Sequence, residues 1–491
     1  GGGGAVYNMP EALHLTGQLD RAALQGALDA LLERHEALRT VFAEGDGSPV
    51  QIVEAAAPFA LRVVGLEHLD EAAREAEIVR HTEEEALAPF DLNTGPLIRA
   101  RLLCLSDAEH VFLITTHHIV SDGVSSGIMV GELAALYAAL VQGRAPALAP
   151  LPIQYPDFAV WQRQWLQGEL LRIQLDYWKT HLAGAPPLLE LPLDRARPAT
   201  QSHRGGNVVF TAGPELAAGL KALAHNQDVT LFASLYTGFA IVLSALSGQD
   251  DLVIGTPSAN RQRTEVEGLI GFFVNTLALR ADLSGNPSVA GLLAQVRAMT
   301  LDAYSHPDLP FEQVVDALQP PRSLGHSPLF QVMLVLQNNL QGELALPGLT
   351  VAPRDIPYDI EKFDLSLTLQ EVDGDLVGRF SYAADLFDRA TIVRWVGYFK
   401  TVLAAMARDP LQRVGEIDML GREERAYLVA GLNDSDMAFR RDGLLHGLFE
   451  EQVARTPDAV ALIHDGRRIS YAELNRRANR VAHTLLARGS G

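Results

Sequence analysis

The sequence predicts an α/β protein made of two sandwich lobes, followed by a short third segment. Helix and strand patterns alternate irregularly in both halves of its 491 residues, which favours α+β sandwich lobes over one continuous sheet. A proline-rich stretch, with Ala185-Pro186-Pro187, Pro192 and Pro198, lies between the halves, and we interpret it as the crossover between the lobes. The polar stretch 431–443 has little periodicity and predicts a linker.

The first lobe is expected to span residues 5–185. Asp20 precedes Leu24, Leu28 and Leu31, whose spacing places them on one helix face, so we expect Asp20 to cap that helix. The turn Gly45-Asp46-Gly47-Ser48 predicts a hairpin. The remaining expected elements are strands at 12–16, 50–53, 97–105 and 111–116 and helices at 71–87, 127–140 and 160–182.

The second lobe is expected to span residues 186–430, and the third segment residues 444–491. The Asp373-Gly374 pair predicts a hairpin between strands 365–372 and 376–382. The other expected elements of this lobe are strands at 208–211, 252–255 and 330–337 and helices at 214–247 and 289–304. In the third segment we expect a helix at 444–454, a hairpin at Asp465-Gly466 and a helix from Tyr471.

Composition excludes several classes of function. Hydrophobic residues make up 48% of the chain, enough for large cores, and the formal charge is −20 with no block rich in Lys or Arg. This charge argues against binding to nucleic acid or to anionic membrane surfaces. The single cysteine, Cys104, fits a reducing compartment, so we expect a cytoplasmic protein. We also expect no apolar stretch of membrane-spanning length.

The candidate site lies where an apolar run, Val111–Thr116, meets the segment His117-His118-Ile119-Val120-Ser121-Asp122-Gly123. The run has the length and β-branched content of a strand. Adjacent side chains of a strand point to opposite faces, so one histidine at most can face a given cavity. Histidine passes or orients protons near neutral pH. A metal site or ordinary core histidines are the alternatives, but the chain has no Cys-x-x-Cys or His-Glu-x-x-His pattern.

Several segments, taken in order, resemble the condensation domains of nonribosomal peptide synthetases. Those domains are relatives of chloramphenicol acetyltransferase, so the resemblance implies a pseudo-dimeric, V-shaped fold with two lobes. It covers essentially residues 5–430. The segments that carry it are Arg34–Phe42, His117–Gly123, Tyr155–Gln162, Ile270–Thr276, His306–Glu312 and His326–Gln331.

The end of the chain carries a second resemblance. Residues 445–489, with Ile469–Asn475, resemble the opening of an adenylation domain, whose nucleotide-binding loop would lie further on. The order of the two domains implies an internal extension module. One departure concerns the family's first motif, a Ser-x-x-Gln helix with a tryptophan, which would precede Tyr7 and is missing, so a clipped condensation domain is one expectation.

The resemblance implies amide formation between a donor aminoacyl or peptidyl thioester and the α-amine of an acceptor aminoacyl thioester. It implies His118 as general base or amine-orienting residue. By the alternation of the strand, we expect His117 to be mainly structural. Asp122 is expected to pair with an arginine and fix the turn; the resemblance suggests Arg261 as that partner, and Arg39 is the alternative.

Two further residues and the partners complete the expectation. Gly123 is expected to keep the tunnel open for a pantetheine thioester. Asn275 is either an oxyanion donor or a residue that fixes the backbone. The resemblance implies phosphopantetheine arms brought by an upstream donor and a downstream acceptor carrier protein, an adenylation domain in the same polypeptide, no bound cofactor or metal, and a monomer.

Related functions remain as alternatives. A heterocyclising relative would carry Asp-x-x-x-x-Asp in place of the double histidine, and this chain does not. An epimerising relative would depart from Phe273–Thr276 and normally follow a carrier protein. A coenzyme A acyltransferase fits the fold but not the adenylation start, and a degenerate domain would act as a docking platform. Gly268–Phe273 and Ser327–Phe330 resemble domains that join an L-donor to an L-acceptor.

Overall fold

A computed structural model of the chain describes residues 4–45, 47–321, 323–337, 346–356, 359–435 and 443–489. It divides into two compact units, Gly1–Gly421 and Arg422–Gly491. The second unit thus begins upstream of the predicted linker 431–443, of which residues 436–442 lie outside the described residues. Asp46, in the predicted hairpin turn, also lies outside them.

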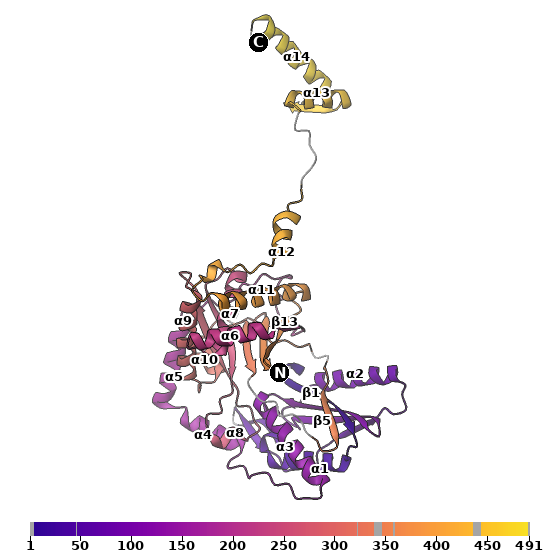
Figure 1. Cartoon of the computed structure of the whole chain (residues 1–491), viewed down its shortest axis with the longest axis vertical. Helices are drawn as coiled ribbons and strands as arrows, with labels where there is room; N and C mark the ends of the chain where they lie inside the picture. The colour runs from indigo at the N-terminus through magenta and orange to yellow at the C-terminus, as the bar shows by residue number, and fades with distance from the viewer. Residues whose placement is uncertain are drawn as a thin grey trace. The chain divides into compact units, whose positions relative to one another are not determined.

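The first lobe of the larger unit is built on a five-stranded sheet (Figure 1). Its order is β11-β1-β6-β5-β4, and only the β4–β5 pair is parallel. The strands are β1 (Asn8–Gly17), β4 (Arg62–Gly65), β5 (Ile98–Ser106), β6 (Glu109–His117) and β11 (Leu349–Pro353), with β2 (Thr40–Gly45) and β3 (Ser48–Val53) forming a separate hairpin.

Helices cover both faces of this sheet. On one face, α1 (Arg21–Arg34) and α3 (Gly123–Val141) share a core with Phe112 and Ile114 of β6. On the other, α2 (Glu71–Leu87) packs Ile78 against the alternate residues of β5 and β6. Asp20 caps α1, as predicted, because its carboxylate accepts a hydrogen bond of 2.9 Å from Ala23 N.

The second lobe is built on a six-stranded sheet of order β7-β13-β12-β10-β8-β9. Its strands are β7 (Gly205–Thr211), β8 (Asp251–Ser258), β9 (Asn275–Asp282), β10 (Val332–Gln337), β12 (Leu365–Val372) and β13 (Asp375–Ala383). Its helices are α6 (Pro214–Asn226), α7 (Leu231–Ser247), α8 (Thr264–Glu267), α9 (Val289–Tyr304), α10 (Phe311–Leu318) and α11 (Arg389–Arg408). Helix α7 is apolar on all sides and lies buried among α6, α9 and α11.

The two lobes exchange chain segments. Strand β11 follows β10 in sequence, yet it pairs with β1 of the first sheet, from Leu13 opposite Pro353 to Gly17 opposite Leu349. In the other direction α5 (Gly168–His181), which we expected in the first lobe, buries Trp178 in the core of the second lobe. The lobes are therefore interlocked and do not meet at one proline-rich crossover.

The long helix expected at 160–182 is two helices. Helix α4 (Tyr155–Trp165) ends before Gly168, which has φ of +58° and opens α5. Glycine takes this left-handed conformation without the penalty that a Cβ brings. Trp161 and Trp165 of α4 stack on each other at 5.0 Å, whereas Trp178 of α5 donates its Nε1–H to His306 O.

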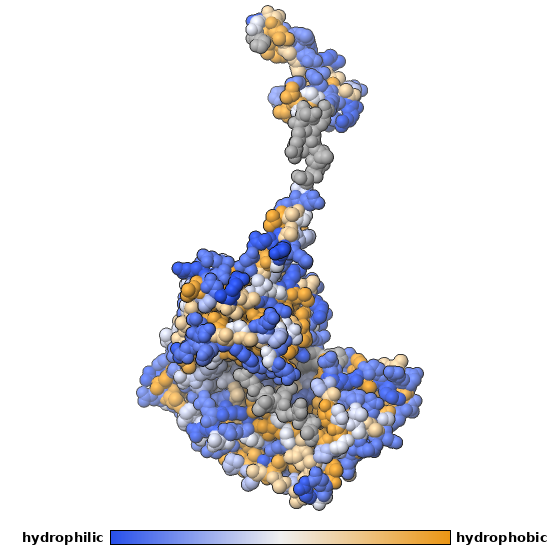
Figure 2. Space-filling model, in the orientation of Figure 1, coloured by the Kyte–Doolittle hydropathy of each residue, from blue (hydrophilic) through white to orange (hydrophobic). Residues whose placement is uncertain are grey.

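The smaller unit contains α12 (Arg422–Ala426), α13 (Leu445–Arg455), the hairpin β14 (Val460–His464) and β15 (Arg467–Ser470), and α14 (Tyr471–Ala487). Ser470 caps α14 through a hydrogen bond that its hydroxyl accepts from Glu473 N. Val481, Leu485 and Leu486 of α14 are exposed, and Figure 2 shows hydrophobic side chains open on this unit.

One helix among the described residues, α3, is long and apolar enough to cross a membrane, which corrects the expectation that no such stretch exists. The bent pair α6 and α7 would meet the same test together. Met129, Leu133 and Tyr137 of α3 are buried in the first core. A buried core helix can have the same length and composition as a membrane-spanning helix, so length and composition do not distinguish the two for α3.

Candidate functional site

The two histidines lie where β6 ends and α3 is about to begin, and their rings face different surroundings. His117 is the last residue of β6 and is buried against Phe90 and Tyr7, with ring centroids 5.9 and 6.0 Å away. Its Nδ1 accepts a hydrogen bond of 3.1 Å from Ile119 N. These contacts of His117 are typical of a structural residue that holds a turn in place.

His118 is held by two backbone hydrogen bonds. Its own N–H donates to Tyr7 O at 2.8 Å, and its Nδ1–H donates to Ser121 O at 2.8 Å. Because a carbonyl oxygen only accepts, the proton of the neutral ring lies on Nδ1, and Nε2 keeps a lone pair. The ring meets Phe272 of the second lobe edge-on, with centroids 5.1 Å apart. His118 therefore presents an acceptor nitrogen beside the second lobe.

Asp122, four residues after His118, makes hydrogen bonds to both lobes. It is 1% exposed and caps α3, since its Oδ1 accepts from Ser125 N and Ser125 Oγ, each at 2.8 Å. Its Oδ2 accepts from the backbone N–H groups of Phe273 and Val274, at 2.9 and 3.2 Å. A carboxylate with this many donors is well compensated for its burial.

Arg261 completes this arrangement from the second lobe. One guanidinium nitrogen donates to Asp122 Oδ1 at 3.1 Å and to Ser125 Oγ at 2.8 Å. The other donates to Val266 O and Leu269 O, and the guanidinium lies 4.1 Å from the centre of the Phe273 ring. Arg261 thus connects the second-lobe segment that carries Val266 and Leu269 to the carboxylate of Asp122, at the start of α3 in the first lobe.

Arg39, the alternative partner of Asp122, does not contact it. It lies at the end of a 3-10 helix, Glu36–Arg39, where its side chain donates to Glu54 O and lies 3.6 Å from Glu36. The alternative is wrong because Arg39 turns toward the β2–β3 hairpin.

Asn275, at the start of β9, uses its whole amide on the backbone. Its Nδ2 donates to Pro307 O and Leu309 O, both at 2.8 Å. Its Oδ1 accepts from Thr276 N and Phe311 N, at 2.9 and 3.1 Å. Both amide hydrogens are engaged, which favours the backbone-fixing alternative over an oxyanion donor.

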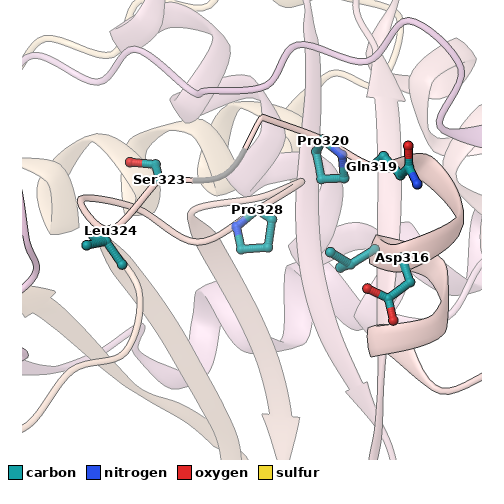
Figure 3. Close-up of a pocket in the computed structure, with 7 residues that line it drawn as sticks. Asp316, Gln319, Pro320, Ser323, Leu324 and Pro328 are labelled. Carbon is teal, nitrogen blue, oxygen red and sulfur yellow. The ribbon is translucent and has the colours of Figure 1, made fainter.

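Gly123 opens α3, and a Cβ built on it would meet nothing within 4 Å. Gly123 is exposed, so packing within the protein does not require a glycine here, and its role in keeping a tunnel open stays a prediction. The cavity of about 750 Å³ in Figure 3 lies elsewhere: α10 contributes Asp316, and Leu324 and Pro328 follow from the next loop. It contains neither histidine.

Burial and a nearby cation keep both histidines neutral. Burial, with smaller contributions from His118 and Lys362, lowers the pKa of His117 to about 4. Burial, followed by repulsion from Lys362, also lowers the pKa of His118; the hydrogen bond to Ser121 O and the charge of Asp122 oppose this. At neutral pH the ring of His118 is therefore an acceptor, while that of His117 is too weak a base to take a proton.

We expect His117 to make folding stability depend on pH. Its folded pKa of about 4 lies below the unfolded value of 6.5, so only the unfolded chain binds this proton between those values. Stability should fall as pH falls from 6.5 to about 4, and His117→Asn should weaken that dependence. Urea unfolding at several pH values measures it. His68→Asn, at an exposed histidine, is the control, and equal pH dependence in both variants would contradict the prediction.

No group of three or more His, Cys, Asp or Glu residues within the described ranges could hold a metal ion. The arrangement that is present can accept a proton or a hydrogen bond at His118 Nε2, in a position fixed from both lobes. Such a group suits the orientation and deprotonation of an incoming amine.

The sequence did not reveal three residues of the site. Ser125 Oγ, which donates its one hydrogen to Asp122 Oδ1, accepts from Gly271 N at 3.1 Å and so ties α3 to the second lobe. Lys362 lies on the second lobe and its charge acts on both histidines, while the adjacent Glu361 fixes its backbone. The position of Ser125, three residues after Asp122 at the start of a helix, could have indicated its contact with that aspartate. No sequence pattern indicated Glu361 or Lys362.

The chain matches two family models. The condensation-domain model matches residues 2–429, and the model of AMP-binding enzymes matches residues 449–491. Among proteins of known function, malpinin synthetase of Mortierella alpina is 49% identical over 100% of this chain, and chondramide synthase of Chondromyces crocatus is 45% identical over 100%. The chain spans only 6% of the length of the first and 13% of the second.

Solved structures agree with the fold. The X-domain from teicoplanin biosynthesis is 33% identical, with a TM-score of 0.78 over 84% of this chain and 93% of that one. The four-domain nonribosomal peptide synthetase AB3403 superposes on 99% of this chain and 37% of its own length, with a TM-score of 0.85 at 23% identity. The two-lobe fold expected from the sequence is therefore confirmed.

Proposed function

Because the chain belongs to the condensation-domain family, we propose that its larger unit forms peptide bonds in nonribosomal peptide synthesis. The substrates are a donor aminoacyl or peptidyl thioester and the α-amine of an acceptor aminoacyl thioester. The observation that carries the proposal is His118, whose Nε2 is free to accept while Nδ1 is committed to Ser121 O.

The proposed reaction needs little more than position and a proton acceptor. The α-amine attacks the thioester carbon, a C–N bond forms, the C–S bond breaks, and the amine proton passes to the departing thiolate. An α-amine has a pKa of about 7.7–8 in model peptides, so part of it is unprotonated at neutral pH. His118 orients that amine and relays its proton, and the network of Asp122 and Arg261 keeps His118 in place.

The proposal includes the partners that the reaction needs. Phosphopantetheine arms of an upstream donor and a downstream acceptor carrier protein bring both thioesters, and the protein itself binds no cofactor or metal. The segment matched by the AMP-binding model is the beginning of an adenylation domain of the same polypeptide. A monomer in the cytoplasm completes the proposal, and the buried free thiol of Cys104 suits a reducing compartment.

The proposed subtype draws on the segment Phe273–Asn275 of the second lobe. This segment is hydrogen-bonded to Asp122 through Phe273 N and Val274 N, and to the segment 307–311 through the side chain of Asn275. We propose an L-donor and an L-acceptor, because this segment keeps the pattern from which epimerising relatives depart.

A reconstituted transfer reaction tests the proposal. A donor carrier protein loaded with a dipeptide and an acceptor carrier protein loaded with an amino acid are mixed with the full chain, and intact-protein mass spectrometry follows the peptide. We expect the peptide to move to the acceptor carrier protein only when the chain is present. A donor ending in a D-residue should react more slowly than its L-counterpart. Absence of transfer with both donors would contradict the proposal.

A docking platform is the second candidate function. The observation that favours it is the similarity to the X-domain from teicoplanin biosynthesis, which is 33% identical to this chain. That X-domain has also been solved in a complex with OxyB. A platform would bind loaded carrier proteins without moving the peptide. Binding without transfer in the same reconstitution would favour it over catalysis.

A further inference from the structure

Lys362 lies at the boundary between the lobes, beside the double histidine. It belongs to the segment before β12, on the second lobe. Its Nζ lies over the ring of Tyr7, 4.4 Å from the ring centre. Tyr7 is a first-lobe residue whose ring is 6.0 Å from that of His117 and whose carbonyl accepts from His118 N. The second lobe thus places a cation on an aromatic residue that contacts both histidines.

The backbone of Lys362 is fixed by the buried carboxylate of Glu361. Glu361 Oε1 accepts from Lys362 N, Phe363 N and Ser366 Oγ, at 2.9, 3.0 and 2.9 Å. Two residues further on, Asp364 is fully buried and paired with Arg197. Lys362 therefore leaves a rigid turn, and the position of its side chain depends on the lobe rather than on a flexible loop.

Lys362 makes no ion pair with an Asp or Glu side chain in the part of the chain that the structure describes, although the charge of the adjacent Glu361 acts on it. Burial lowers its pKa to about 8, and Glu361 opposes this shift, so the ammonium is mostly charged at neutral pH. It is poorly hydrated, and its field is weakly screened.

The other groups around His118 are largely compensated. His117 precedes it on β6 and is neutral at pH 7. Asp122 is paired with Arg261. From α4, the hydroxyl of Tyr155 donates to Phe272 O, and burial raises its pKa to about 12, so it carries no charge. Glu11 of β1 is mostly buried, and burial raises the pKa of its carboxyl. Among the described residues, Lys362 is the cation that acts on His118 without a paired carboxylate.

We propose that Lys362 is a positioning residue for the reaction: its cation, brought by the second lobe over Tyr7, adds to burial in keeping His118 in the unprotonated form that can accept from the amine. The inference rests on the proposed function for its meaning in the reaction. Its physical content, the effect of one charge on one imidazole, can be measured without that function.

The experiment titrates His118 directly in the full chain. Histidine labelled at the Cε1 carbon is observed by NMR between pH 4 and 9, and the His118→Asn spectrum assigns the resonance. Lys362→Met should move the His118 midpoint to higher pH, because a repelling charge is removed. Lys362→Arg, which keeps a cation over Tyr7, should leave the midpoint close to that of the parent. Lys362→Gln repeats the test with a second neutral side chain.

The outcomes separate this inference from the proposed function. Equal midpoints in the parent and both neutral variants would overturn the role of Lys362, whatever the transfer reaction does. A higher His118 midpoint in both neutral variants, with the parental midpoint kept in Lys362→Arg, supports the role of Lys362 even if the chain transfers no peptide. If transfer occurs, the neutral variants should lose more of it at pH 6 than at pH 8. A merely structural lysine would give the same fractional loss at both.

Discussion

Replacing His118 by alanine is expected to slow peptide transfer by about 10²–10⁴-fold, the range for loss of a positioned acid–base group. The structure gives the reason: Nε2 is the ring nitrogen left free once Nδ1–H donates to Ser121 O. A loss at the lower end of that range would indicate that His118 mainly orients the amine, since an amine with a pKa of about 7.7–8 needs little help to deprotonate. Single-turnover transfer between loaded carrier proteins measures the loss.

The matched control is His14→Ala. His14 lies on β1 of the same sheet, where it is partly exposed and paired with Glu109. This variant should transfer peptide at the parental rate. Circular dichroism and the unfolding midpoint must show that both variants are folded. Equal rates in the parent and in His118→Ala would remove His118 from the mechanism.

The second large effect is expected on stability. Arg261→Met leaves the carboxylate of Asp122 buried without its cation, and Asp122→Asn leaves the guanidinium of Arg261 without its anion. Breaking a buried pair from one side costs about 3–5 kcal/mol. Each single variant should therefore lower the free energy of unfolding of the larger unit by this amount, as measured by urea unfolding. Asp122→Asn also puts an amide NH2 where Oδ2 accepts from Phe273 N and Val274 N, so this variant should be the less stable of the two.

The double variant and an exposed pair complete this test. Arg261→Met with Asp122→Asn should cost less than the two single changes together, because the second change removes the group that the first left uncompensated. Arg172→Met breaks an ion pair with Asp176 in which both side chains are more than half exposed, and it should cost below about 1 kcal/mol. A cost for Arg261→Met as small as this would show that the buried network does not join the lobes.

The site could be predicted from the sequence where its residues are local. The run 111–116 forms a strand, as predicted, but β6 ends at His117 and His118 lies in the following turn, so the roles expected from alternation along the strand stay predictions. The partner of Asp122 could not be chosen from periodicity, because Arg39 and Arg261 are both far away in sequence and only tertiary structure decides between them. Lys362 was missed for the same reason, since its contact with Tyr7 exists only where the lobes meet.

The fold shows the same limit. Elements with a strong local pattern, such as the capped helix after Asp20 and the hairpin at Asp373-Gly374, are present as predicted. Helix α11 was missed although its buried side chains recur at helical spacing, because Thr391, Val393 and Phe399 lower its local helix preference. The lobe to which α5 belongs depends on where Trp178 is buried, and no local pattern specifies that.

Strand β11 has a consequence for how the first lobe can exist. It covers the outer edge of β1 from Leu13 to Gly17, a stretch that would otherwise present unpaired N–H and C=O groups. Bare sheet edges recruit strands from other molecules and so promote aggregation. A first lobe synthesised without residues 349–353 would carry such an edge, and so would the nascent chain on the ribosome until β11 emerges. The early part of this protein is therefore prone to aggregation until β11 pairs with β1. In the finished sheet the edge is the short strand β11, which ends in Pro353 and is a poorer template for pairing.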